Sequence, residues 1–221
     1  MNETQLLFIR IPVILIALTV HEFFHGYIAW VRGDNTAKQA GRLTFNPIAH
    51  LDVLGTLMLF FGPFGWAKPV PVNPYNLDNP KRDMIFVGAA GPVSNIVLAL
   101  LFGFLLRFLS SSGLITSPTS ALAIFLQLSV LINLGLSFFN LLPVPPLDGS
   151  NILLGFLPQD KVSTYLKLVR YAPQIFIFLI ITDWIYSRLH IGYPLFSFII
   201  YPIFNVYFNF WQFIIFGGKV M

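Results

Sequence analysis

Residues 6–30 read LLFIRIPVILIALTVHEFFHGYIAW, an apolar run that contains the pattern His21-Glu22-Phe23-Phe24-His25. This run is long enough to cross a bilayer as a helix, which needs about 20 apolar residues. On a helix, side chains four residues apart share one face and lie about 6 Å apart along the axis, so both imidazoles can reach one metal ion. The pattern H-E-x-x-H therefore predicts a metal site within a membrane helix, with Glu22 beside the metal as a general base.

The composition agrees with a membrane protein. Of the 221 residues, 56% are hydrophobic and only 10% are charged, whereas about 25% of the residues in a typical soluble domain are charged. We therefore expect an all-α polytopic membrane protein in which residues 1–221 form a single domain. A formal net charge of +4 would suggest a nucleic-acid partner in a soluble chain. Here the basic residues lie in loops beside apolar runs, so they indicate topology and no nucleic-acid partner is expected.

Five further apolar runs follow, and together with the first they predict about five to six transmembrane helices. They are Leu51–Phe64, Met84–Leu109, Ala121–Leu142, Pro173–Tyr186 and Pro194–Phe216. Leu51–Phe64 is short for a span, and the loops on its two sides each carry three Lys or Arg residues. Because basic loops stay on the cytoplasmic side, Leu51–Phe64 is expected to be a re-entrant segment that enters the membrane and returns.

The basic residues also predict how the chain threads through the membrane. With the N-terminus outside, ten of the 13 Lys and Arg residues fall inside, and Arg10, Arg107 and Arg188 fall near the outer face. His25 precedes Arg32 by seven residues, which places the metal on the order of 10 Å below the cytoplasmic surface. We therefore expect a multi-pass protein of the cell membrane, surrounded by the lipid bilayer, with its site facing the cytoplasm.

A third metal ligand is needed, because catalytic zinc usually has three protein ligands and one open position. The chain has no cysteine, so this ligand must be a histidine or a carboxylate. Asp148 is favoured, since the stretch NLLPVPPLDG at 140–149 must break a strong helix, and broken backbone at membrane depth is tolerated where it lines a cavity. A solvated Asp in a turn remains the alternative, because Pro-x-x-Asp-Gly is also ordinary turn chemistry. The other candidates are Asp52, Asp183, His50 and His190.

Several motifs together resemble those of the site-2 protease family of intramembrane zinc metalloproteases, in its compact bacterial form without appended domains. The first two are HEFFHG at 21–26 and N-x-x-P-x-P-x-L-D-G at 140–149. Between them lie GRLTFNP at 41–47, GWAKPVPVNP at 65–74 and AGPVSN at 90–95. The resemblance covers about residues 15–155, and the last two apolar runs carry no motif of the family. Val53 stands where relatives often have proline.

The resemblance implies a Zn²⁺ ion held by His21, His25 and Asp148, with a water molecule activated by Glu22. It also implies hydrolysis of a peptide bond in or near a transmembrane helix of a membrane-protein substrate, close to the cytoplasmic face. The expected location is a bacterial plasma membrane.

Three further residues are candidates for substrate binding or for support of the metal ligands. The family uses the equivalents of Asn140 and Asn95 near its cleft, so the resemblance implies this role for both. His50 is a third candidate, for which hydrogen bonding within its loop is favoured over a transient role at the metal.

The two motif-bearing loops contain prolines and β-branched residues at 41–45 and 66–73. They could form a small membrane-edge β element that pairs with an unwound substrate. They could equally be ordinary cytoplasmic loops, and the sequence favours neither interpretation.

Two other functional classes compete with a protease. A zinc transporter would also place His and Asp inside the membrane, but it needs neither Glu22 nor a proline-broken ligand loop, and the sequence lacks the two similar halves that transporters usually show. A non-catalytic homologue that retains the metal is not distinguished by sequence. The substrate, its trigger and the oligomeric state have no readable pattern.

Overall fold

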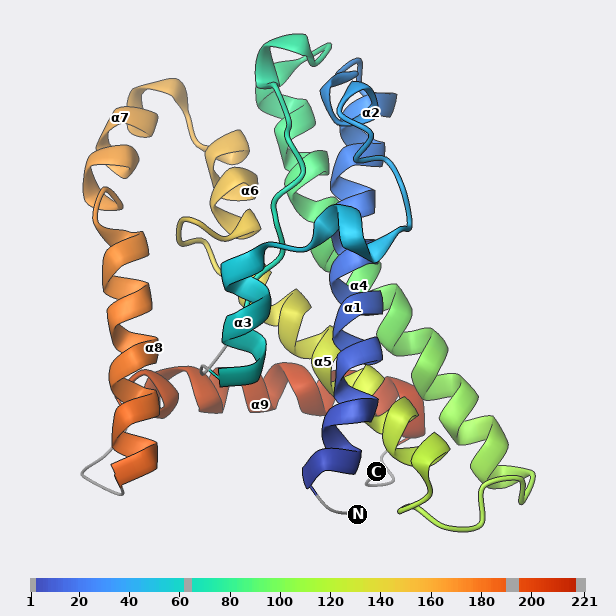
Figure 1. The fold of residues 1–221 in the computed structure, drawn as a ribbon. Helices are drawn as coiled ribbons and strands as arrows, with labels where there is room; N and C mark the ends of the chain where they lie inside the picture. The colour runs from blue at the N-terminus through green and yellow to red at the C-terminus, as the bar shows by residue number, and fades with distance from the viewer. Residues whose placement is uncertain (1–2, 62–64, 190–194, 218–221) are drawn as a thin grey trace.

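The chain folds into helices joined by short irregular segments, as its alternation of apolar runs and Pro- and Gly-containing loops predicts (Figure 1). The computed structural model describes residues 3–61, 65–189 and 195–217. The long helices are α1 (Glu3–Val31), α4 (Pro80–Ser111), α5 (Ala121–Leu141), α8 (Ala172–Leu189) and α9 (Leu195–Phe216). The short elements are α2 (Thr36–Gln39), η1 (Pro47–His50), α3 (Val53–Phe61), η2 (Pro74–Asn76), α6 (Asp148–Phe156) and α7 (Gln159–Leu168).

Helices α1, α4 and α5 pack against one another at the centre of the molecule, and α6 packs against α4 and α5. Ala17, Ala99 and Ala123, one from each central helix, are completely buried. Small side chains at such interfaces let helix backbones approach closely, which stabilises helix pairs where surrounding lipid removes the hydrophobic driving force. The three helices therefore form the frame that carries the polar residues of the site.

Local sequence signals set the ends of the central helices. Asn79 and Ser120 are the N-caps of α4 and α5, and their side-chain oxygens accept hydrogen bonds from backbone N–H groups of the first turn. Pro80 occupies the first position of α4, where a backbone N–H would have no partner within the helix, so its absence costs no hydrogen bond. At the other end of α5, the helix stops at Leu141, two residues before Pro143, because proline cannot continue a helix.

Four of the described helices, α1, α4, α5 and α9, are long and apolar enough to cross a membrane. A fifth span exists if α7 and α8, which meet at a bend of 41°, cross as one broken helix. The prediction of an almost all-helical, multi-pass membrane protein is confirmed, with four or five candidate spans in the described residues against the predicted five to six. The predicted re-entrant segment holds α3, whose nine residues extend about 13 Å and are too short to span.

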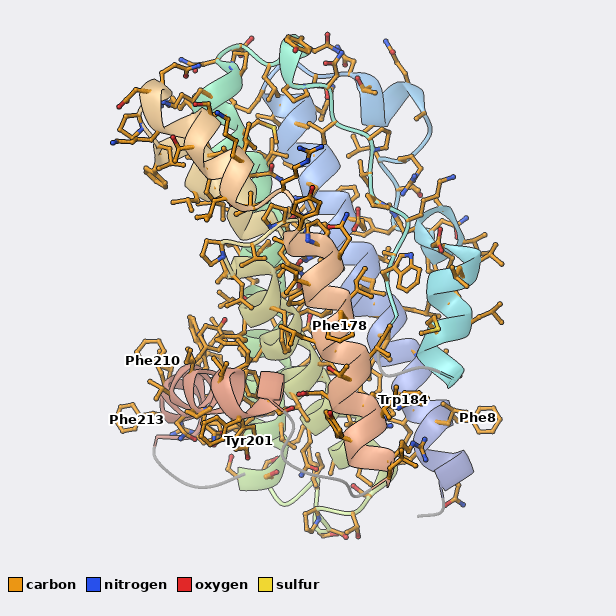
Figure 2. The ribbon with its side chains drawn as sticks, turned by 90° about the vertical axis from the view of Figure 1, so that its left-hand side faces the viewer. Phe8, Phe178, Trp184, Tyr201, Phe210 and Phe213 are labelled. Carbon is orange, nitrogen blue, oxygen red and sulfur yellow. The ribbon has the colours of Figure 1, made fainter. Side chains whose placement is uncertain are left out.

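Large apolar side chains cover the outside of the helices. In Figure 2, Phe8 of α1 and Phe210 and Phe213 of α9 project away from the ribbon. Phe8 is 73% exposed and Phe213 is 65% exposed. Apolar surface of this extent is rare on soluble proteins, and it matches the lipid-facing surface of a membrane protein.

Helix α9 lies across the bundle, as the two views at right angles show (Figures 1 and 2). Both of its ends are held by charged side chains of other helices. Asp183 of α8 accepts hydrogen bonds from Ser197 N and Oγ, at 2.6 and 2.7 Å. Arg107 of α4 donates to the carbonyl of Ile215 at 2.8 Å. An anion at the N-terminal end and a cation at the C-terminal end complement the helix dipole, so they stabilise α9 in this position.

The small membrane-edge β element predicted from residues 41–45 and 66–73 is not formed, since the described part of the chain contains no sheet. It contains an isolated antiparallel bridge between Leu51 and Ala67. Pro69 and Pro71 have no N–H to donate, and the N–H of Val70 between them binds Glu22. Residues 69–71 therefore offer no free N–H donor to a pairing strand.

Candidate metal centre

His21 and His25 lie on one face of α1, as their spacing of four residues requires. Both side chains are buried, with His21 5% and His25 8% exposed. Their Nε2 atoms are 3.0 Å apart, and the ring planes meet edge to face at 78°. The two nitrogens therefore point at a common position beside α1.

Asp148 is the first residue of α6 and follows the irregular segment 142–147. The prediction that the prolines break this helix is confirmed. Because α6 packs against α4, Asp148 reaches α1 although 123 positions separate it from His25. Its Oδ2 atom lies 3.1 Å from His21 Nε2 and 3.2 Å from His25 Nε2. The structure thus brings all three predicted ligands together.

The three donor atoms form a nearly equilateral triangle with sides of 3.0, 3.1 and 3.2 Å. In a tetrahedral zinc site with bonds of about 2.0–2.1 Å, ligand atoms lie about 3.3 Å apart. Two imidazoles and one carboxylate are also a donor set that suits zinc and leaves a fourth position open. Within the described residues, His21, His25 and Asp148 are the group of His, Asp and Glu side chains that could hold a metal ion.

The second nitrogen of each imidazole is held by a partner that fixes the ring. His21 Nδ1 donates to Asn95 Oδ1 at 2.6 Å, and His25 Nδ1 donates to the carbonyl of Val87 at 2.7 Å. With the proton on Nδ1, each Nε2 keeps its lone pair for a metal. Both partners belong to α4, so this helix orients the two ligands of α1.

Asn95 is itself fixed by a further amide. Its Nδ2 donates to Asn133 Oδ1 at 2.8 Å and to the carbonyl of Ala17 at 3.2 Å. Asn133 of α5 is fully buried and donates in turn to Ser129 O. The prediction from sequence included Asn95 but missed Asn133. Its signal was available, since Ser129, Asn133 and Ser137 form a polar stripe at four-residue spacing on an otherwise apolar helix.

Gly91 of α4 faces the donor triangle. A Cβ atom added at this position would lie 2.6 Å from His21 Nε2 and would also collide with His25 Nε2. Any side chain at position 91 would therefore occupy the space in front of the ligand atoms. The absence of a side chain there and the donor geometry together fit a bound metal ion.

Glu22 lies between the two histidines in sequence and is partly exposed. Its Oε2 atom accepts a hydrogen bond from the backbone N–H of Val70 at 2.8 Å. This bond fixes the carboxylate and leaves Oε1 for a proton transfer. A carboxylate that is held at one oxygen and open at the other can accept a proton.

Two predicted residues lie outside this cluster. Asn140 donates to Leu136 O in its own helix and makes no hydrogen bond to the ligands in the described structure. His50 is buried in η1, where its Nε2 donates to Thr44 O at 2.8 Å. This agrees with the favoured interpretation of His50 as a hydrogen-bonding residue of its loop.

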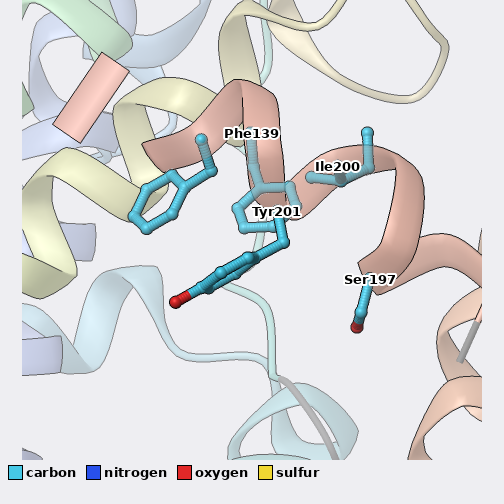
Figure 3. A pocket seen from close by; sticks show the side chains of 5 residues that line it. Phe139, Ser197, Ile200 and Tyr201 are labelled. Atoms are coloured by element: carbon cyan, nitrogen blue, oxygen red, sulfur yellow. The ribbon is translucent and has the colours of Figure 1, made fainter. Parts of the chain in front are cut away.

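A separate apolar pocket of about 110 Å³ lies between the end of α5 and the first half of α9 (Figure 3). Phe139, Ser197, Ile200, Tyr201 and Phe204 line it. None of the metal-ligand candidates contributes to this pocket, so it is distinct from the donor triangle.

The chain is similar in sequence to known zinc metalloproteases. The model of the family "Peptidase family M50" matches residues 115–182, which include Asp148. "Putative zinc metalloprotease YwhC" of Bacillus subtilis (strain 168) is 37% identical over 194 residues, covering 87% of this chain and 84% of that protein. "Putative zinc metalloprotease Rip2" of Mycolicibacterium smegmatis is 30% identical over 76% of this chain and 64% of that protein. Rip2 of Mycobacterium tuberculosis (strain H37Rv) is 33% identical over 61% and 52%, respectively. No solved structure matches the chain.

Proposed function

Because this chain belongs to peptidase family M50, we propose that it is an intramembrane zinc metalloprotease whose general base is Glu22. Its substrate would be a membrane protein, cut in or near a transmembrane helix and close to the cytoplasmic face. The observation that carries this proposal is the triangle of His21, His25 and Asp148 donor atoms, with Glu22 adjacent to His21 in α1 and its carboxylate bonded to the Val70 N–H. The relatives named zinc metalloproteases support zinc as the metal.

Zinc bound to this triangle would supply Lewis acidity, which polarises the scissile carbonyl and makes water a stronger acid. The carboxylate of Glu22 then accepts a proton from the attacking water at Oε1 while its Oε2 stays bonded to the Val70 N–H. The same carboxylate returns the proton to the leaving amide nitrogen, so one residue acts first as base and then as acid.

The protein groups around the ligands prepare this chemistry in advance. Asn95 and the Val87 carbonyl hold the two imidazoles in fixed rotation and in one tautomer. Ligands that are already oriented need no reorganisation when a metal or substrate arrives. The Asn133 amide extends this rigidity into α5.

The proposed depth of the site rests on the position of the ligands along α1. The histidines lie in the C-terminal half of a 29-residue helix, nearer to the end that leads into α2 and faces the start of α4 (Figure 1). Arg32 in the turn after α1, Lys38 of α2, and Lys81 and Arg82 in the first turn of α4 lie at this end, and basic residues beside spans favour the cytoplasmic side. We therefore place the site toward the cytoplasm in a bacterial plasma membrane.

The test compares wild type with Glu22→Gln and Asp148→Asn in liposomes that contain a panel of single-span substrates. Zinc content is measured in each protein before the assay. Glu22→Gln is nearly isosteric and keeps an oxygen acceptor for the Val70 N–H, so it removes the base alone. Asp148→Asn weakens the metal site itself.

We expect zinc in wild type and Glu22→Gln, cleavage in wild type only, and reduced zinc in Asp148→Asn. Zinc in both of the first two proteins without cleavage in either would favour a metal-binding homologue without protease activity. Wild type without zinc would contradict the proposed metal site. Zinc transport into the liposomes without cleavage would favour a transporter.

A further inference from the structure

Residues 66–73, which we call the strap, run along α1 and supply the Val70 N–H that binds Glu22. Pro69 and Pro71 flank Val70, so its N–H is the one backbone donor among residues 69–71. Proline also fixes the backbone dihedral φ, which makes this part of the strap stiff. A displacement at one end of the strap is therefore passed on to Val70.

The strap is anchored on both sides of Val70. On the near side, the N–H of Lys68 donates to His50 O at 2.8 Å, and Arg42 Nη2 donates to the Lys68 carbonyl at 2.6 Å. On the far side, the N–H of Asn73 donates to Asp34 Oδ2 at 2.7 Å. Val70 and its contact with Glu22 lie midway between these anchors.

Arg42 is the side chain that holds the near anchor in the described structure. It is a buried cation, only 8% exposed, and it reaches across 26 positions to a backbone carbonyl. His50 contributes its backbone carbonyl to the same anchor, an interaction that many residue types could make. A charge-assisted hydrogen bond is roughly twice as strong as a neutral one, so the guanidinium dominates this anchor.

Val70 packs against Gly26 of α1. A Cβ atom at position 26 would lie 3.0 Å from Val70 Cγ1 and 3.2 Å from Ala37 Cβ. Gly26 is one helical turn beyond Glu22, so the absence of its side chain lets Val70 approach α1 where the carboxylate is. The close packing and the hydrogen bond thus locate the same contact.

We propose that Arg42 is a positioning residue for Glu22: it fixes the Lys68 carbonyl, the stiff strap transmits this position to Val70, and the Val70 N–H orients the carboxylate. This inference rests on the proposed role of Glu22 as general base. It assigns to the loop motif at 41–47 a function in catalysis, although none of its residues belongs to the metal-binding cluster.

The experiment measures kcat and KM for cleavage of a single-span substrate by wild type, Arg42→Ala, Arg42→Lys and Arg82→Ala. Arg82 is an exposed arginine at the same end of the molecule and serves as the matched control. We expect Arg42→Ala to lower kcat about tenfold with KM changed less than about twofold. Arg42→Lys should recover most of kcat because it keeps a cationic donor, and Arg82→Ala should match wild type.

A second readout does not use activity. Because the chain has no cysteine, Ala67→Cys introduces a single thiol into the strap at a position that is 8% exposed. We expect its alkylation to be about tenfold faster when combined with Arg42→Ala than alone or with Arg82→Ala, because the near end of the strap loses its side-chain anchor. Zinc content should stay at the wild-type level in all of these proteins.

Each contrary result has a separate meaning. Unchanged kcat in Arg42→Ala, with or without faster alkylation, would overturn the positioning role. A raised KM with normal kcat would also overturn it, because the strap would then hold the substrate. A zinc-loaded wild type that cleaves nothing would instead refute the proposed function, while alkylation would still show whether Arg42 anchors the strap.

Gly26→Ala gives an independent test if Arg42→Ala does not fold. The added methyl would lie 3.0 Å from Val70 Cγ1, so Val70 has to shift by a few tenths of an ångström, while the Arg42 anchor stays intact. The inference predicts a lower kcat with little change in KM. Wild-type kcat in Gly26→Ala would contradict it.

Discussion

The Asn95 side chain donates a hydrogen bond to Asn133 Oδ1 at 2.8 Å, and through it α5 is connected to the metal ligand His21 of α1. Both amides are fully buried. Burying a side-chain amide costs free energy unless its polar atoms form hydrogen bonds. In Asn95 and Asn133, both the amide oxygen and the amide nitrogen have a hydrogen-bond partner. The network therefore specifies how three helices meet at the site and which way the His21 ring faces.

Replacing Asn95 should weaken zinc binding without removing a ligand. In Asn95→Ala, His21 loses the acceptor that fixes its ring and tautomer, and groups in this position typically contribute about 10–100-fold to metal affinity. Competition with a chelator measures the zinc affinity directly. Asn140→Ala is the matched control, because Asn140 bonds within its own helix. Equal affinities in the two variants would contradict the orienting role of Asn95.

Gly91→Ala should abolish zinc binding. The new methyl would stand against the Nε2 atoms of His21 and His25, where a metal has to sit. Gly135→Ala in α5 tests the general effect of removing a helical glycine, because a Cβ there meets nothing within 4 Å. We expect Gly135→Ala to bind zinc normally and to be stabilised by about 0.5–1 kcal/mol. Normal zinc content in Gly91→Ala would show that the metal does not occupy the triangle.

Asp34 should make the stability of the loop region depend on pH. Burial of Asp34 opposes its ionisation, but hydrogen bonds from Thr36, Asn76 and Asn73 outweigh this effect and hold the pKa of Asp34 below its ordinary value of 3.8. A lowered pKa means that the folded state favours the ionised form, so the stabilisation is complete above 3.8 and is lost as the pH falls through the folded pKa. We expect Asp34→Asn to cost about 1–3 kcal/mol near pH 6.

The measurement for Asp34 is the difference in unfolding free energy between wild type and Asp34→Asn as the pH is lowered. This difference should shrink below pH 3.8. Asp160 of α7 is exposed. The unfolding free energy of Asp160→Asn should therefore stay close to that of wild type at every pH. A difference for Asp34→Asn that stays constant on acidification would contradict the prediction.

The position of α9 should depend on the bond between Asp183 and Ser197. A double-mutant cycle with Asp183→Asn and Ser197→Ala should give a coupling energy of about 1–2 kcal/mol, because the carboxylate accepts a hydrogen bond from Ser197 Oγ that alanine cannot donate. Thermal unfolding in detergent supplies the free energies. Strictly additive effects of the two substitutions would mean that the bond from the Ser197 hydroxyl does not help to hold the helix.

The two candidate ligands of α1 and the long helices could be predicted because their signals are local. Helical geometry alone puts His21 and His25 on one face, and proline chemistry alone ends α5 at Leu141. The identity of Asp148 as the third ligand followed from the break in that helix together with the resemblance. Its arrival beside α1 depends on the packing of α6, which no local pattern reveals.

The parts that sequence could not supply are those that depend on tertiary contacts. Residues 66–73 have the prolines and β-branched residues of an edge strand, but Glu22 takes the N–H of Val70, so no strand forms. The apolar run at 194–216 satisfies every length criterion for a span. Asp183 contacts the N-terminal end of this helix and Arg107 contacts its C-terminal end. Both residues belong to other helices, so the sequence of the run itself does not reveal its position across the bundle.

The separation of Asp148 from the two histidines also bears on biosynthesis. Among the described helices, α1 carries His21, Glu22 and His25, whereas Asp148 follows in the sequence only after α1, α4 and α5. A nascent or prematurely terminated chain that stops before α6 therefore holds the base and two ligands without a complete centre. The three donor atoms can therefore meet only in a chain that has been synthesised through α6.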